Sequence, residues 1–288
     1  MNTVITTIDE RCKDCFLKTY QRLFHTFDVD PVQRQTFHDF FQKTVRSFQH
    51  LTSPEIQRLL NREFCRMVRV DDLFAKEKAQ SNAIALALYD EWKPKVLASN
   101  NPFDLALRLS IAGNIMDYGA NNNFDLHQTI QKVLQATFAI DHSKLLYDKI
   151  KKAQKILYLG DNAGEIVFDK LFIETCLFDK QVYFAVKDAP TLNDVTINEA
   201  KEVEIDKVAT IISNGFDAPS TVLSSCNKAF LEIYHSADLI ISKGQGNYEG
   251  LMYENDPRIF FLLMAKCDVI AEKLNVTKGS FIVYHQNE

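Results

Sequence analysis

The sequence predicts an α/β protein, a three-layer α/β/α sandwich with a mostly parallel sheet, preceded by an all-helical domain. Two observations lead to this fold class. From about residue 16 to residue 150, apolar residues recur at the spacing of the buried face of an amphipathic helix. Beyond residue 150, short apolar runs alternate with stretches of helical composition, which is typical of a parallel sheet covered on both faces. We therefore predict a helical domain over residues 1–148 and an α/β domain over residues 149–288.

The first half carries several helix signals and no convincing strand. Residues 32–45 form an apolar stripe with helical spacing. Ser-Pro-Glu at 53–55 predicts a helix start, because it offers a hydroxyl cap, a proline at the first helical position and an acid at the positive end of the dipole. Residues 72–88 are rich in the helix formers Ala, Leu and Lys, and Asn-Pro at 101–102 precedes a further helix.

Short apolar runs in the second half predict the strands of the sheet. Ligands of such sheets bind outside the carboxyl ends of the strands, so the residues after each run matter most for function. The runs occupy residues 156–159, 182–186, 208–212, 239–242, 259–264 and 281–284.

Polar residues after the first and second runs could form a metal site. Asp161 and Asn162 follow the first run, and Asp194 follows the second. Carboxylate and amide oxygens are the ligands that Mg²⁺ prefers, and a substrate phosphate often completes its shell. The simpler alternative is that Asp161 and Asn162 cap the next helix, and that Asp194 is a first-turn acid of the helix after Leu192. Both interpretations stay open from spacing alone.

The loop after the fourth run suits a phosphate group. Lys243 offers a positive charge, and the glycines at 244 and 246 let backbone amides approach closely. The dinucleotide fingerprint G-x-G-x-x-G is not matched, since only Gly160 and Gly164 are present, and there is no G-x-x-x-x-G-K-[ST] loop.

Two other enzyme classes are disfavoured. Haloacid-dehalogenase-like phosphatases place a second aspartate two residues after the first, where this chain has Ala163. The G-x-S-x-G elbow of serine hydrolases is also missing.

Composition limits the partners and the compartment. The 288 residues contain 33 Lys and Arg and 38 Asp and Glu, a formal charge of −5, so the chain gives no general reason to expect a nucleic acid or an anionic membrane as partner. No window approaches the length of a membrane span, and no basic-then-apolar leader opens the chain. Six cysteines are too sparse for a disulfide scaffold. We expect a soluble, reduced, cytoplasmic protein.

Five motifs follow one another along the chain: Cys12-x-x-Cys15, Gly-Asn-Ile-Met-Asp-Tyr-Gly at 113–119, Gly-Asp-Asn-Ala-Gly-Glu at 160–165, Asn-Asp-Val-Thr at 193–196 and Lys-Gly-Gln-Gly-Asn-Tyr-Glu at 243–249. Together they resemble the damage-control phosphatase family, also called ARMT-like or domain of unknown function eighty-nine. The Cys-x-x-Cys pair indicates the subgroup of that family that carries it.

The resemblance implies a metal-dependent phosphatase that hydrolyses phosphate monoesters of small metabolites, such as sugar phosphates or damaged phosphometabolites. The metal would be Mg²⁺, Mn²⁺, Co²⁺ or Ni²⁺. Matching the motifs residue by residue implies the roles. Asp161, Asn162 and Asp194 would bind the metal; Asp161, Asp194 and Lys243 would be catalytic; and Asn114, Asp117, Asn193, Lys243 and Asn247 would bind substrate.

Several alternatives remain at this stage. Asn114 and Asp117 lie in an otherwise apolar helix, which favours a helix facing a wet cleft over a pair that caps a helix end. Cys12 and Cys15 could be structural residues at a helix start, two ligands of a metal, or a redox pair. For the whole chain, the alternative is a non-catalytic protein that binds a metabolite or nucleotide in the same cleft. Carboxyl methyl transfer ranks last, because no glycine-rich cofactor loop is convincing.

Overall fold

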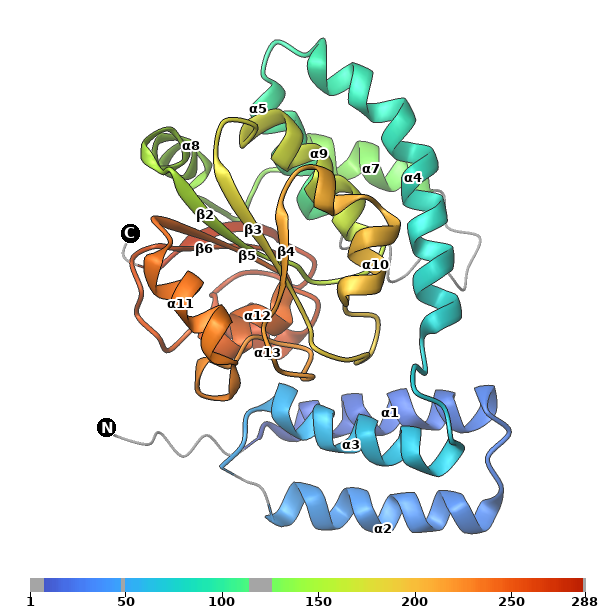
Figure 1. The fold of residues 1–288 in the computed structure, drawn as a ribbon. Coiled ribbons are helices and arrows are strands. Elements are labelled where there is room, and N and C mark those ends of the chain that lie inside the picture. The colour runs from blue at the N-terminus through green and yellow to red at the C-terminus, as the bar shows by residue number, and fades with distance from the viewer. Residues whose placement is uncertain (1–7, 48–49, 114–125, 287–288) are drawn as a thin grey trace.

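The computed structural model describes residues 8–47, 50–113 and 126–286, and its central feature is a seven-stranded sheet (Figure 1). The strand order is β1-β7-β6-β5-β2-β3-β4. All neighbours are parallel except β6 and β7, which confirms the predicted mostly parallel sheet. The strands are β1 (Ile140–Asp141), β2 (Lys155–Leu159), β3 (Gln181–Val186), β4 (Thr210–Ser213), β5 (Leu239–Lys243), β6 (Ile259–Met264) and β7 (Phe281–His285).

Helices cover both faces of the sheet, as the predicted sandwich requires. Alternate residues of a strand point to opposite faces. Ile156 and Tyr158 of β2 join one apolar core, and Leu157 and Leu159 join the other. None of the described helices is both long and apolar enough to cross a membrane. The helices are α1 (Glu10–Thr26), α2 (Pro31–Ser47), α3 (Ser53–Val68), α4 (Ala75–Leu97), α5 (Pro102–Ala112), α7 (Leu126–Gln135), α8 (Ser143–Lys152), α9 (Glu165–Cys176), α10 (Ile197–Glu202), α11 (Lys228–Ser236), α12 (Gly244–Leu251) and α13 (Asp268–Lys273).

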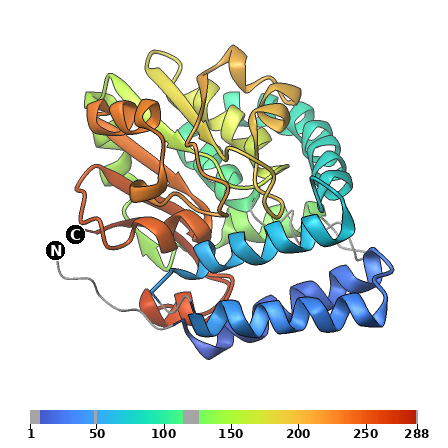
Figure 2. The ribbon, with the colours of Figure 1, turned by 60° about the horizontal axis from the view of Figure 1, so that its bottom comes forward.

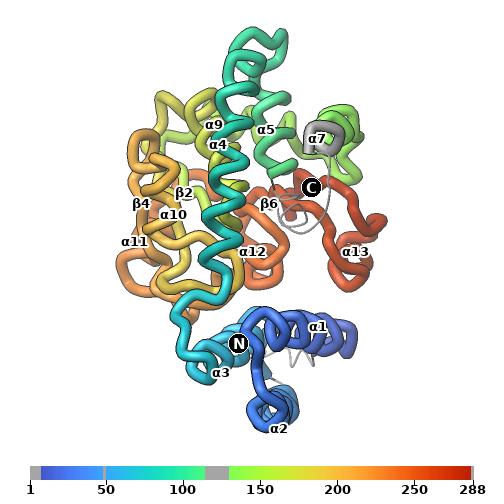
Figure 3. Tube along the Cα trace, turned by 90° about the vertical axis from the view of Figure 1, so that its right-hand side faces the viewer, coloured from blue at the N-terminus to red at the C-terminus, as the bar shows by residue number. Residues whose placement is uncertain are grey.

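The first half of the chain contributes directly to the sandwich. Trp92 of α4 and Leu107 of α5 share the first core with Phe168 of α9. In Figure 3, α4 runs upward from the α3 end of the molecule to α5 and α9. The strand β1 corrects the expectation that this half is all-helical: it has only two residues, too few for an apolar run. The boundary at 148/149 stays a prediction, and side chains from both sides of it share one core.

Helices α1, α2 and α3 form a separate unit, residues 10–68, which we call the cap. Its core is aromatic and includes Tyr20, Phe37 and Phe64, whose rings lie 4.7 to 5.5 Å apart. The helix predicted at residues 53–55 begins at Ser53, but its N-cap is Thr52 and not Ser53, and the Thr52 backbone N–H donates to the Glu55 carboxylate. Figure 2 shows the three helices stacked together on one side of the α/β part.

Paired arginines anchor the cap to the loop that follows β4. Arg58 and Arg62 of α3 donate to the two oxygens of Asp217, each at 2.5 Å. The Arg58 guanidinium also lies 4.7 Å from the centre of the Phe216 ring. Burial alone would raise the pKa of Asp217, but the hydrogen bonds from the two arginines outweigh it and hold that pKa below its ordinary value.

Replacing this carboxylate should loosen the cap. Asp217→Ala should lower the free energy of unfolding by about 1–2 kcal/mol, because both guanidinium groups lose a charged acceptor while Arg62 is already partly hydrated. The wild-type contribution is fully present above about pH 4, the unfolded-state pKa, and is lost as the pH falls through the lower folded-state pKa. Urea unfolding at pH 7 and pH 3 measures both effects.

The matched control is Glu232→Ala, which removes an exposed ion pair with Lys228 on α11 and should change stability by less than about 0.5 kcal/mol. Equal losses in the two variants at pH 7 would contradict the anchoring role of Asp217.

Candidate active site

The candidate site lies where the strand order reverses, between the carboxyl ends of β2 and β5. The chain winds from β2 to β3 and β4 on one side, then returns to β5 on the other side of β2. Such a switch point leaves a crevice in which α/β proteins bind ligands. Here the backbone after β5 touches the side chain after β2: a Cβ on Gly244, whose φ is +77°, would lie 1.9 Å from Asp161 Oδ2. Only glycine allows this approach.

The structure brings Asp161, Asn162 and Asp194 together. Asn162 and Asp194 pair as an isolated antiparallel bridge, and Val195 N–H donates to the Asp161 carbonyl at 2.9 Å. The Asn162 amide nitrogen donates to Asp161 Oδ2 at 2.7 Å. All three residues are buried, with 5%, 5% and 3% of their surface exposed. The loop after β3 is therefore held against the turn after β2 by backbone hydrogen bonds.

The helix-capping alternatives do not apply to these residues. Helix α9 is capped by Gly164, and α10 is capped by Thr196 with Glu199 completing a capping box. Asp161, Asn162 and Asp194 all lie before these caps. Their polar groups face the crevice region for a reason other than helix initiation.

Lys243, predicted to hold the phosphate, lies beneath the crevice with its side chain turned into the core, and its contact with phosphate stays a prediction. Its side chain is fully buried, and its ammonium donates to Glu165 Oε1 at 2.6 Å, Asp169 Oδ1 at 2.6 Å and the Ser110 carbonyl at 2.8 Å. An ammonium has three donors, so all of them are used inside the protein. Tyr158 completes the cluster by donating its hydroxyl to Asp169 at 2.7 Å. Lys243 is a structural cation in this arrangement.

Asn247 is likewise buried beneath the site, and its predicted contact with substrate stays a prediction. Its amide nitrogen donates to the carbonyls of Gly160 and Lys243, at 3.1 and 2.8 Å. Its amide oxygen accepts from Lys187 at 3.1 Å and from Thr221 at 2.9 Å. Asn247 therefore ties the turn after β2 to the end of β5.

Of the remaining predicted residues, Asn193 lines the cavity above the site, whereas Asn114 and Asp117 lie outside the described residues. The last described residue before them, Gly113, packs against α9: a Cβ there would lie 2.9 Å from Glu165 Cα.

A cavity of about 220 Å³ opens above the three polar residues, between the sheet and the cap. Cap residues Phe16, Thr19 and Gln57 form part of its wall, and Lys266 lines it from the sheet side. Lys266 was not predicted from the sequence. It follows the apolar run at 259–264 by two residues, so the expectation that residues after each strand carry function also applied to it. The site residues that line this cavity are Asp161, Asn162, Asn193, Asp194, Gln245 and Lys266.

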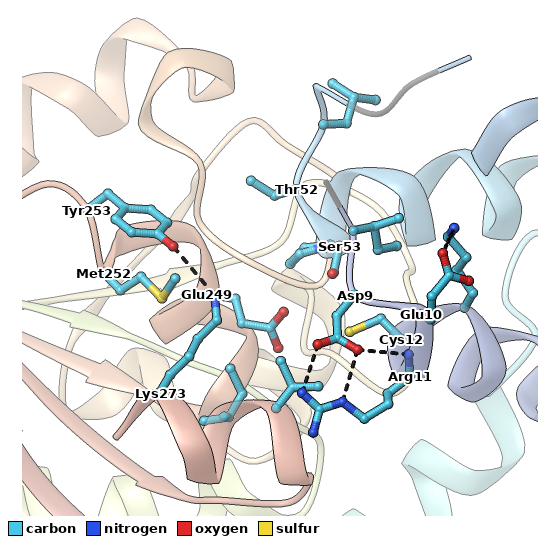
Figure 4. Close-up of a pocket in the computed structure, with 16 residues that line it drawn as sticks. Asp9, Glu10, Arg11, Cys12, Thr52, Ser53, Glu249, Met252, Tyr253 and Lys273 are labelled. Carbon is cyan, nitrogen blue, oxygen red and sulfur yellow. Dashed lines mark hydrogen bonds and ion pairs between the residues drawn. The ribbon is translucent and has the colours of Figure 1, made fainter. Parts of the chain in front are cut away.

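A second cavity, of about 820 Å³, adjoins the first (Figure 4). Ser53, Pro54 and Glu249 line both cavities, so the two meet at these residues. Asp9, Arg11 and Lys273 give the larger cavity a mixed charge.

The charges at this edge fit a divalent cation. Burial, and then the charges of Glu165 and Asp194, raise the pKa of Asp161 well above its ordinary value. Among the described residues, no three His, Cys, Asp or Glu side chains are already gathered as ligands; here the third oxygen donor is the amide of Asn162. Two buried lysines, Lys187 and Lys243, face four buried carboxylates: Asp161, Glu165, Asp169 and Asp194. With the half-buried Lys266, which also acts on Asp161, three lysines face the four carboxylates, and the remaining negative charge and the all-oxygen donor set suit a hard cation.

Two lysine variants should distinguish a lysine buried beneath the site from a lysine that lines its cavity. Lys243→Met should lower the free energy of unfolding by about 3–5 kcal/mol or prevent folding, because it leaves Glu165 and Asp169 buried without their cation. Lys266→Met should cost less than about 1 kcal/mol, because Lys266 is only half-buried at the cavity wall. Soluble yield and urea unfolding measure the difference. Equal effects of the two substitutions would contradict the structural role of Lys243.

Comparison with known proteins identifies the family. A profile of the damage-control phosphatase ARMT1-like domain matches residues 8–282. The damage-control phosphatase of Pyrococcus horikoshii is 34% identical over 281 residues, which cover 96% of this chain and 96% of that protein. The damage-control phosphatase of Archaeoglobus fulgidus is 30% identical over 229 residues, 77% of this chain and 79% of that protein.

A solved structure has the same fold. The crystal structure of a DUF89 family protein from Pyrococcus horikoshii matches with a TM-score of 0.90 and 32% identity, covering 97% of this chain and 99% of that chain. The Cys-x-x-Cys subgroup stays a prediction. The family predicted from the five motifs is confirmed: the chain belongs to the damage-control phosphatase ARMT1-like domain family.

Proposed function

We propose that this chain is a metal-dependent phosphatase that hydrolyses phosphate monoesters of small metabolites. Named relatives are phosphatases, which supports the reaction class. The observation that carries the metal dependence is the meeting of Asp161, Asn162 and Asp194 at the switch point, in excess of the buried positive charge. Asp161, Asn162 and Asp194 would hold the metal, with Mg²⁺, Mn²⁺, Co²⁺ or Ni²⁺ all suited to oxygen ligands.

When bound, such an ion neutralises negative charge on the phosphoryl group and lowers the pKa of a bound water. The residues of the chain prepare its site. The Asn162 amide nitrogen donates to Asp161 Oδ2 at 2.7 Å and lies 3.5 Å from Glu165 Oε2, which orients the amide, and the amide oxygen would be the atom that binds the ion. Lys243 keeps Glu165 in position through its 2.6 Å hydrogen bond.

Lys266 and Asn193 are the residues placed to hold the phosphate. Both line the same small cavity as the three metal-site residues, and the charge of Lys266 acts on Asp161. A lysine at this wall would bind a phosphate oxygen by a charge-assisted hydrogen bond. The small cavity favours a compact ester, because ligand pockets for larger molecules usually measure 300 Å³ or more. Phe16, Thr19 and Gln57 of the cap would contact the group that carries the phosphate.

The first test measures phosphate release by chelator-stripped protein on sugar phosphates, nucleotides and a chromogenic ester, with each of the four metals. Asp194→Asn should reduce metal-dependent turnover on the order of 10³-fold, because the ion that stabilises the transition state loses a charged ligand. Asp188→Asn is the matched control. That acid follows the same strand, is exposed and accepts from Ser213, and its loss should leave turnover unchanged. Full activity of Asp194→Asn would remove that residue from the mechanism.

A second test addresses Lys266. Lys266→Met should raise KM about 10-fold to 100-fold, because one charge-assisted hydrogen bond to the substrate is lost. Lys278→Met, which removes an exposed lysine paired with Asp268, should leave KM unchanged. An unaltered KM in Lys266→Met would show that another group holds the phosphate.

The alternative function is a non-catalytic protein that binds a metabolite or nucleotide in the same cavity. Calorimetric binding of phosphate esters with no phosphate release under any of the four metals would favour it over the phosphatase.

A further inference from the structure

Three of the six cysteines lie around Glu249 and Gln245 beside the active-site cavity, and the proposed phosphatase reaction uses none of them. Cys12 and Cys15 lie one turn apart in α1, and Cys267 is the N-cap of α13, just after Lys266. Residues three apart on a helix share a face. The sequence alone offers only the Cys-x-x-Cys pair; the fold adds the third thiol from a segment about 250 residues away.

Glu249 lies at the centre of this group. It lines the larger cavity together with Cys12 and the smaller cavity together with Cys15. In Figure 4 the Cys12 sulfur and the Glu249 carboxylate both point into the larger cavity. The amide nitrogen of Gln245 donates to Glu249 Oε1 at 3.1 Å and to Cys267 Sγ at 3.4 Å, which links the carboxylate to the third thiol. We call Cys12, Cys15, Cys267 and Glu249 the thiol cluster.

Within the thiol cluster, Glu249 and Cys267 make the thiols of Cys12 and Cys15 harder to ionise. Burial raises the pKa of Cys12 to about 11, and Glu249 and Cys267 add to the effect. Burial, then Cys267 and Glu249, raise the pKa of Cys15, and burial raises the pKa of Glu249 against the opposing effects of Gln245 and Lys273. Packing alone explains the group poorly, because Cys15 is exposed and the two other thiols are only half-buried. A cation between them would instead favour the ionised thiolates.

We propose that Cys12, Cys15 and Cys267, with Glu249 as the fourth ligand, bind a thiophilic divalent cation of the zinc class. Zinc takes four ligands drawn from cysteine sulfur, histidine nitrogen and carboxylate oxygen, and a Cys-x₂-Cys pair is a usual source of two of them. The four side chains do not gather at ligand distance in the described structure, so binding of the ion would require them to move toward one another. Each thiol gives up a proton to solvent on binding.

The cation would connect the cap to the sheet next to the active site. Cys12 and Cys15 belong to the cap, whereas Cys267 and Glu249 belong to the sandwich. The neighbouring Lys266 backbone N–H donates to Gln245, the residue that holds Glu249 and Cys267. The thiol cluster is distinct from the oxygen site at Asp161, so its occupation does not depend on the proposed phosphatase activity.

Cobalt is the probe for this site, because Co²⁺ bound by thiolates gives a strong near-ultraviolet charge-transfer band and Zn²⁺ is silent. The full chain is stripped with chelator, kept reduced, and titrated with Co²⁺. We expect a thiolate band that saturates as Co²⁺ is added and is displaced by Zn²⁺. The band should persist in Asp194→Asn, which alters only the oxygen site. It should be lost in Cys267→Ser and in Cys15→Ser.

The matched control is Cys226→Ser, which changes a half-buried thiol that contacts the Val222 carbonyl in another part of the sandwich and should keep the band. Circular dichroism verifies that each variant is folded, and the exposed Cys15 gives a usable variant if Cys267→Ser does not fold. Cobalt binding with no thiolate band would overturn the proposal, as would a band that survives Cys15→Ser. If the reduced protein gave no band and oxidised glutathione removed two thiols, the proposed metal site would be overturned in favour of a disulfide.

Discussion

The structure depends on the ion pairs between buried lysines and a group of buried carboxylates at one edge of the sheet. Asp161, Glu165, Asp169 and Asp194 are all buried there, and an isolated buried charge is too costly to persist. Lys243 reaches two of these acids from below and Lys187 approaches a third. On the cavity side, where Asp161, Asn162 and Asp194 meet, the half-buried Lys266 also acts on Asp161. The acids outnumber the lysines around them, which supports the proposal that a cation from solution binds there.

The helices next to the site do not use these polar groups as caps. Gly164 and Thr196 begin the two helices, and neither helix uses Asp161, Asn162 or Asp194 as its cap. Gly244 lets the turn after β5 lie directly on the Asp161 carboxylate. Asn82 of α4 holds the turn after β2, because its side-chain oxygen accepts from Gly164 N–H at 2.7 Å. The cap covers the cavity. Its apolar and polar side chains line the part of the cavity where the group that carries the phosphate would bind.

The sequence predicted the strands better than the orientation of individual side chains. Each of the six apolar runs became a strand, because buried parallel strands need continuous apolar residues. Strand β1 was missed because two residues make no run, and α4 and α5 were assigned to a separate domain because periodicity shows that a helix has a buried face but not what covers it. The rule that strand ends carry function located Lys243 but could not show that its side chain turns into the core. Cys267 was unremarkable until the fold placed it beside α1.

The most direct test of the account is the position of a bound metal. Crystals of the full chain soaked with Mn²⁺ and inorganic phosphate would be measured at a wavelength where manganese scatters anomalously. The account predicts an anomalous peak within ligand distance of Asp161, Asn162 and Asp194, with phosphate on its cavity side near Lys266. Manganese bound elsewhere, with these three residues unliganded at saturation, would contradict the metal site on which the proposed phosphatase rests.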